Sequence, residues 1–115
     1  AINTIVGMGI DIKSQKSQLH TILGGLSGPA IKPIALANIY KIYQAVTIPI
    51  IGLGGISCME DIIEFVLAGA DLVQIGTLNY KDPNIGIRLA SEIDNYCNLN
   101  NIKNLQEIKG KVRID

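Results

Sequence analysis

The sequence predicts an α/β fold in which short parallel strands alternate with helices, and three observations carry this prediction. Ile48–Leu53 and Asp71–Ile75 are short apolar runs, as in strands that are covered on both faces. A segment with helical spacing of apolar residues separates them, so a right-handed crossover would make the two strands parallel. Both strands end in small residues, Gly54-Gly55 and Gly76-Thr77, which parallel pairing would bring to the same side.

A third strand is predicted at Ala1–Val6 (AINTIV), where Asn3 and Thr4 are polar interruptions. These two residues either cap the strand or face a pocket with hydrogen-bond donors and acceptors. Three parallel strands by themselves would leave bare edges and a bare face, and a closed (β/α)₈ barrel takes about 250 residues. We therefore predict one domain, residues 1–115, cut from a longer protein: the C-terminal part of a (β/α)₈ barrel, covering strands 6 to 8.

Between the first two strands the sequence predicts a hairpin and then a loop of defined shape. Ile10–Ile12 alternates like an exposed strand, Leu19–Leu23 is its expected partner, and Lys13–Ser17 would form the turn. Gly24–Pro33 (GGLSGPAIKP) contains three glycines and two prolines, a composition that favours a loop over a helix. Loops of this kind often carry function.

Three helices follow from apolar spacing and from start and stop signals. Ser57 is expected to open the central helix, with Glu60 at capping-box spacing and Gly69 ending it. The predicted buried face of this helix is Ile62, Ile63, Val66 and Leu67. The helix that begins near Pro33 should bury Ala35, Ile39, Ile42 and Val46. The helix after Asp82 should bury Ile85, Leu89, Ile93 and Tyr96.

The two glycine-containing strand ends suggest a phosphate site. Glycine lets a phosphate approach backbone N–H groups closely, and a helix N-terminus adds free donors and partial positive charge. In (β/α)₈ barrels such a site often lies in the loops after strands 7 and 8. A single glycine pair more often only makes a turn, but two in register on one βαβ unit favour a ligand.

Composition excludes several classes of partner. Ten basic and ten acidic residues give a formal net charge of zero, which argues against nucleic acid as the main partner. Cys58 and Cys97 have no metal-type spacing, so we expect no metal and reduced thiols in a cytoplasmic protein. The longest uncharged run, Ala45–Met59, is too short to span a bilayer. His20 has no pattern of partners around it that would indicate a chemical role.

Four motifs resemble the dihydroorotate dehydrogenases: INT (Ile2–Thr4), GGLSGPAIKPIAL (Gly24–Leu36), IPIIGLGGI (Ile48–Ile56) and LAGADLVQIGT (Leu67–Thr77). The GGLSGPA loop is the most specific of them and is similar to that of class 1 enzymes, particularly the NAD-linked branch, class 1B. The glycine motifs by themselves are shared with other flavin and phosphate barrels. The resemblance implies a flavin mononucleotide (FMN) that oxidises dihydroorotate to orotate in pyrimidine synthesis.

The same resemblance implies roles for individual residues. It assigns substrate binding to Asn3 and Thr4, and flavin contact to Ile2 and Gly28. The phosphate clamp it implies is Gly54, Gly55, Gly76 and Thr77, the same four residues that the strand ends indicate. The catalytic cysteine and the flavin-contacting lysine of the family lie on earlier segments and have no counterpart here. We therefore expect no catalytic residue in this chain, do not assign Cys58 as the base, and expect the isolated chain to be inactive.

Partners and alternatives complete the sequence-based expectations. The resemblance implies a homodimer and, for class 1B, a subunit with FAD and an iron–sulfur centre that passes electrons to NAD; class 1A would use fumarate. One alternative is another flavin or phosphate barrel, such as a dihydrouridine synthase-like or phosphosugar enzyme, which the GGLSGPA and INT motifs argue against. The other is a non-catalytic fragment that serves as a structural or interaction module.

Overall fold

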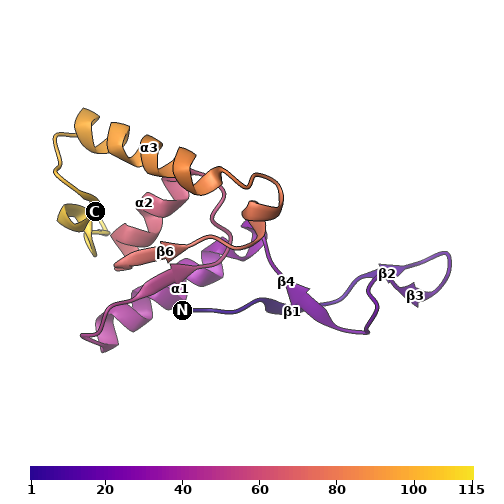
Figure 1. The fold of residues 1–115 in the computed structure, drawn as a ribbon. Coiled ribbons are helices and arrows are strands. Elements are labelled where there is room, and N and C mark those ends of the chain that lie inside the picture. The colour runs from indigo at the N-terminus through magenta and orange to yellow at the C-terminus, as the bar shows by residue number, and fades with distance from the viewer.

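The computed structural model describes residues 1–115 and consists of a helical body with a projecting arm (Figure 1). The strands are β1 (Ile5–Gly7), β2 (Ile10–Asp11), β3 (Lys16–Ser17), β4 (Gly24–Leu26), β5 (Ile51–Leu53) and β6 (Leu72–Gln74). The helices are α1 (Lys32–Ala45), α2 (Met59–Ala68) and α3 (Ile85–Leu99), with the 3₁₀ helices η1 (Pro29–Ile31), η2 (Thr77–Tyr80) and η3 (Leu105–Ile108). No helix combines the length and the apolar character needed to cross a membrane.

The body is built on the parallel pair β5 and β6, as the sequence predicts. Gly52 pairs with Val73 at the centre of this two-stranded sheet, and α2 connects the two strands. The predicted third parallel strand is wrong. β1 pairs antiparallel with β4, with Val6 opposite Gly25, because the glycine-rich segment after the hairpin is extended and supplies the partner. The start of the chain nevertheless reaches the body, where the Ala1 amino group donates to the Ile51 carbonyl at 2.7 Å.

The tip of the arm is a shorter hairpin than predicted. β2 pairs with β3, so that Asp11 lies opposite Lys16, and Leu19–Leu23 is not the partner (Figure 1). The reason is local hydrogen bonding, since the Asp11 carboxylate accepts the N–H groups of Lys13 at 2.9 Å and Ser14 at 3.4 Å. The turn therefore starts at Ile12, one residue before the predicted one.

The buried faces of the helices largely follow the predicted spacing. Ile62, Ile63 and Val66 of α2 are buried, and Leu67 is half-buried. The structure also buries the α1 residues Ala35 and Ile39 and the α3 residues Ile85 and Leu89. Ile42, Ile93 and Tyr96 are half-buried. Val46 is exposed, contrary to prediction, because α1 ends at Ala45 and the chain then leaves the core.

Phe65 is the largest fully buried side chain and lies against β5. A Cβ atom on Gly52 would lie 2.5 Å from Phe65 Cδ1 and 3.2 Å from the Cβ of Ala70. Gly52 therefore has no side chain because the phenyl ring occupies that space. This contact sets how closely α2 packs on β5, and so where the loop between them runs.

A second set of contacts fixes the other end of the β5–β6 pair. The Asp71 carboxylate accepts the Ile50 N–H at 2.8 Å and forms an ion pair with Lys109, which follows η3. The Lys109 ammonium also lies 5.6 Å from the centre of the Tyr43 ring. The C-terminal segment thus closes the sheet at the strand starts, away from the strand ends that carry the glycines.

Gly52→Ala should destabilise the protein by about 1–3 kcal/mol, because the added methyl group overpacks a filled core. Gly86→Ala is the matched control, since a Cβ at this α3 position meets no atom within 4 Å. Alanine in an exposed helix should stabilise by about 0.5–1 kcal/mol. Urea unfolding of both variants measures the two effects, and equal stabilities would contradict the Gly52–Phe65 contact.

Candidate functional site

One cavity of about 690 Å³ lies at the carboxyl ends of β5 and β6. Its walls come from four segments: the start of the chain, the loop between β4 and α1, the turn after β5, and the segment from β6 through η2. All eight residues predicted for cofactor or substrate binding line it: Ile2, Asn3, Thr4, Gly28, Gly54, Gly55, Gly76 and Thr77. The fold therefore brings together residues that are up to 75 positions apart in the sequence.

The turn after β5 needs both of its glycines for backbone conformation and for packing. Gly54 has φ +125° and Gly55 has φ +77°, a range that other residues rarely adopt. A Cβ on Gly54 would lie 2.9 Å from the Cβ of Ala35. A Cβ on Gly55 would lie 2.8 Å from both the Gly28 carbonyl oxygen and the Lys32 backbone nitrogen. These glycines thus let the turn pack against the start of α1, in addition to any ligand contact.

Gly76 differs from the other two glycines. A Cβ there would meet no protein atom within 4 Å, so the space beside it is open. The next residue, Thr77, donates its hydroxyl proton to the Ser27 hydroxyl at 3.0 Å. This bond joins the GGLSG loop to the segment after β6. A hydrogen bond therefore joins two segments of the cavity wall that are 50 positions apart in the sequence.

Helix α2 begins one residue later than predicted, and a carboxylate of its first turn accepts hydrogen bonds from the two residues before it. Cys58 is the N-cap residue, and Asp61 holds the position assigned to Glu60 in the predicted capping box. The Asp61 carboxylate accepts the Ser57 N–H at 2.7 Å, the Ser57 hydroxyl at 2.8 Å and the Cys58 N–H at 3.2 Å. The backbone N–H groups of Gly55 and Ile56 form no hydrogen bond within the chain. The turn before the helix therefore offers two free donors.

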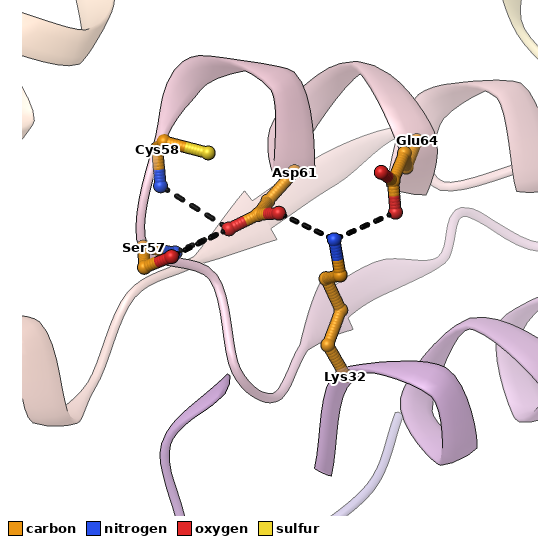
Figure 2. A network of polar contacts seen from close by, with 5 residues as sticks. All are labelled: Lys32, Ser57, Cys58, Asp61 and Glu64. Atoms are coloured by element: carbon orange, nitrogen blue, oxygen red, sulfur yellow. Dashed lines mark hydrogen bonds and ion pairs between the residues drawn. The ribbon is translucent and has the colours of Figure 1, made fainter. Parts of the chain in front are cut away.

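Lys32 connects this helix start to α1. Figure 2 shows its side chain reaching from α1 to two carboxylates of α2, with Nζ 2.6 Å from Asp61 and 2.9 Å from Glu64. Burial raises the pKa of the Asp61 carboxyl, but hydrogen bonds from Lys32 and Ser57 outweigh it and hold the pKa well below its usual range. The bonds to Asp61 and Glu64 raise the pKa of Lys32. Both groups are therefore ionised at neutral pH.

The substrate-side residues lie on the non-helical, non-strand segment before β1. The Asn3 side-chain oxygen accepts the Thr4 N–H at 2.8 Å. That bond leaves the amide donor of Asn3 free, and the side chain is exposed on the cavity wall. Thr4 packs its side chain beside Gly25 of β4. This local bond is the one hydrogen bond of the Asn3 side chain.

Sequence reasoning missed four polar residues on the cavity wall: Ser27, Ser57, Gln74 and Lys81. Lys81 is the one charged side chain among the lining residues. Ser27 lies in the GGLSGPA motif and Gln74 in the LAGADLVQIGT motif. Neighbouring residues of both motifs are predicted site residues, so the sequence could have indicated these two as well. Ser57 was assigned only to helix capping. Lys81 follows a 3₁₀ helix that sequence periodicity does not reveal, and nothing in its neighbourhood indicated a site.

Comparison with known proteins decides the family. The family model for dihydroorotate dehydrogenase matches residues 1–97. The chain belongs to the dihydroorotate dehydrogenase family. The catalytic subunit of dihydroorotate dehydrogenase B (NAD(+)) from Parabacteroides distasonis is 49% identical over 113 residues, which are 98% of this chain and 37% of that protein. The subunit of the same name from Thermoanaerobacter sp. is 48% identical over 99% of this chain and 38% of that protein.

A solved structure agrees with this family membership. The crystal structure of a DHODH from Eimeria tenella in complex with ferulenol matches with a TM-score of 0.74 and 28% identity, covering 95% of this chain and 29% of that one. The predicted resemblance to the class 1B branch is confirmed by the relatives. The chain spans a little over a third of the length of these curated dihydroorotate dehydrogenases.

Asp61→Asn should lower stability at neutral pH by about 1–3 kcal/mol, because it removes the charged partner of Lys32. The folded-state pKa of Asp61 lies below its unfolded value of about 3.9, so its contribution is complete above that pH and falls as pH drops toward the folded-state value. Thermal melts at neutral and acid pH should therefore show wild type and variant converging in acid. Asp94→Asn, an exposed change on α3, controls for loss of charge. A difference independent of pH would contradict the ionised pair.

Proposed function

We propose that this chain forms the FMN phosphate grip and part of the substrate pocket of an enzyme that oxidises dihydroorotate to orotate in pyrimidine synthesis. One observation carries the proposal. The residues that the motifs assign to cofactor and substrate come from four separate segments and line a single cavity. Family membership makes dihydroorotate the expected substrate, and no observation favours the phosphosugar or dihydrouridine synthase-like alternatives.

The proposed phosphate end of the cavity could bind an anion through hydrogen-bond donors and a positive charge, without a metal ion. Free N–H groups at Gly55 and Ile56 stand on one side, and the open space beside Gly76 on the other. Lys81 also lines the cavity and adds a positive charge. The Ser27 and Thr77 hydroxyls can donate hydrogen bonds. In this proposal those groups hold the FMN phosphate, while Ile2 and Gly28 contact the flavin.

The chemistry divides between the cofactor and the chain. FMN, when bound, takes the hydride from the substrate, and the protein supplies binding and orientation. In our proposal Asn3 and Thr4 hold dihydroorotate through an amide and a hydroxyl, which can both donate and accept. Cys58 is a poor candidate for the base. It does not line the cavity, and burial raises the pKa of its thiol, which disfavours the thiolate.

The rest of the active site belongs, in this proposal, to the longer protein. The chain spans 37–38% of its curated relatives, and we assign it to the C-terminal part of a (β/α)₈ barrel. The apolar side chains of Ile51 and Leu72, paired on β5 and β6, are exposed and suit contact with further barrel strands. The base would come from such a segment. We therefore expect the isolated 115-residue chain to lack turnover.

The electron acceptor and partners extend the same proposal. The two curated relatives are named as catalytic subunits of NAD(+) enzymes. By analogy, we propose that electrons leave this protein for NAD through a second subunit that carries FAD and an iron–sulfur centre. The resemblance also implies a homodimer. The alternative electron acceptor is fumarate, which class 1A enzymes use. Steady-state assays with NAD and with fumarate would distinguish the two acceptors.

Gly76→Val in the full-length protein should abolish FMN retention. The valine side chain would enter space that no protein atom occupies, so the loss would come from the cofactor's phosphate and not from the core. The measurement is flavin absorbance per mole of purified, folded protein. Gly86→Val is the matched control, because its Cβ also meets no atom and the residue lies on α3 outside the cavity. A yellow, fully loaded Gly76→Val protein would remove Gly76 from the phosphate site.

Asn3→Ala in the full-length enzyme should keep the flavin and lower the catalytic efficiency with dihydroorotate by at least about tenfold, since leaving a polar group of the substrate unpaired in the closed pocket costs about 1–3 kcal/mol. Steady-state kinetics on flavin-loaded protein measures this, alongside a thermal melt. Asn95→Ala, at an exposed position of α3, should leave the kinetics unchanged. If Asn3 only shapes the segment before β1, the melt or the flavin content would change while catalytic efficiency per flavin stayed normal.

A further inference from the structure

Two walls of the cavity meet at the start of α1. Gly28 and Gly55 both line the cavity, and they touch behind its surface, where a Cβ on Gly55 would lie 2.8 Å from the Gly28 carbonyl oxygen. The same Cβ would lie 2.8 Å from the Lys32 backbone nitrogen. Any shift of α1 relative to the turn after β5 would therefore change the shape of the phosphate end of the cavity.

A chain of polar contacts spans this junction. Ser57, a wall residue, gives both its N–H and its hydroxyl proton to one oxygen of Asp61. The other oxygen of Asp61 accepts from Lys32 Nζ at 2.6 Å. As Figure 2 shows, the path runs from the turn after β5, through the first turn of α2, to α1. One carboxylate thus ties the two wall segments together.

The pair also controls charge beside the proposed phosphate. The Asp61 side chain is only 7% exposed and lies one hydrogen bond from the cavity wall. An unpaired carboxylate there would repel a phosphate, and its repulsion would be screened weakly because it is buried. Lys32 supplies the compensating charge. Glu64, the second partner of Lys32, is 45% exposed and so matters less.

We propose that Lys32 and Asp61 are positioning residues for the phosphate end of the flavin site: the pair holds the turn after β5 against the Gly28 loop and neutralises the carboxylate behind it. The inference rests on the proposed function, since it concerns the same cavity. It differs from a purely structural role in one respect. A pair that only joins α1 to α2 would affect all ligands alike, whereas this one acts on the phosphate.

The test compares FMN with riboflavin, which has the same ring system and lacks the phosphate. Full-length protein is stripped of flavin and titrated with each ligand, for wild type, Asp61→Asn, Lys32→Gln, Lys32→Arg and the double variant Lys32→Gln/Asp61→Asn. Asp71→Asn is the matched control. It breaks an equivalent ion pair, with Lys109, at the far end of the same strands.

We expect Asp61→Asn to weaken FMN binding about tenfold, because the turn after β5 loses its tie to α1 and this outweighs the removal of one negative charge, and to change riboflavin binding less than about twofold. Lys32→Gln should weaken FMN binding more, because it leaves a buried carboxylate unpaired. The double variant should bind FMN better than Lys32→Gln does, since it removes that carboxylate. Lys32→Arg keeps the charge and should stay near wild type. Asp71→Asn should lower the melting temperature without changing the preference for FMN.

Three results would overturn the inference: equal losses for FMN and riboflavin, unchanged FMN affinity in both single variants, or a double variant no better than Lys32→Gln. A failure of the proposed function looks different. In that case the wild-type protein itself would bind FMN no more tightly than riboflavin. Lys32→Arg retains the pair's charge, so the preference for FMN remains measurable in it even if a neutralising variant does not fold.

Discussion

The parallel pairing of β5 and β6 is the constraint on which the site depends. Because the strands run the same way, with Leu53 opposite Gln74, the turns that follow them emerge at one end of the sheet. Phe65 holds α2 close to β5 over Gly52, which brings the helix start beside those turns. The cavity is therefore a consequence of strand direction and of one close helix–strand contact.

Polar groups of the turn before α2 contribute to the cavity wall. At the start of α2, Asp61 accepts hydrogen bonds from the N–H groups of Ser57 and Cys58. The N–H groups of Gly55 and Ile56, in the turn before the helix, form no hydrogen bond within the chain. This arrangement places a carboxylate close to a proposed phosphate, which is tolerable because Lys32 balances its charge.

Much of the body was predictable from the sequence, and the eight residues assigned to cofactor and substrate line one cavity. Apolar runs marked β5 and β6, helical spacing marked the buried faces, and the glycine pairs marked the strand ends. The N-terminal arm was not predictable in the same way. β1 pairs with Gly24–Leu26, a segment whose glycines indicated a loop, and β2–β3 depends on the side-chain bonds of Asp11. Such pairings follow from long-range or single-residue contacts that local patterns do not contain.

The site residues that escaped prediction share a physical cause. Ser27 and Lys81 reach the cavity because the β4–α1 loop and η2 come together at the Thr77–Ser27 hydrogen bond. Asp61 was not singled out because capping spacing favoured Glu60 by one position, and Lys32 is an isolated lysine in the sequence. Their partnership spans 29 positions and becomes visible only when α1 lies beside α2.

The most direct test of the phosphate site is a crystal structure of the full-length protein with FMN bound. We expect the phosphate oxygens within hydrogen-bond distance of backbone N–H groups in the turn after β5, with Gly76 and Thr77 on the opposite side. We also expect the flavin ring to extend toward Ile2 and Gly28. A flavin phosphate bound elsewhere in the protein, with this cavity holding only water, would contradict the assignment.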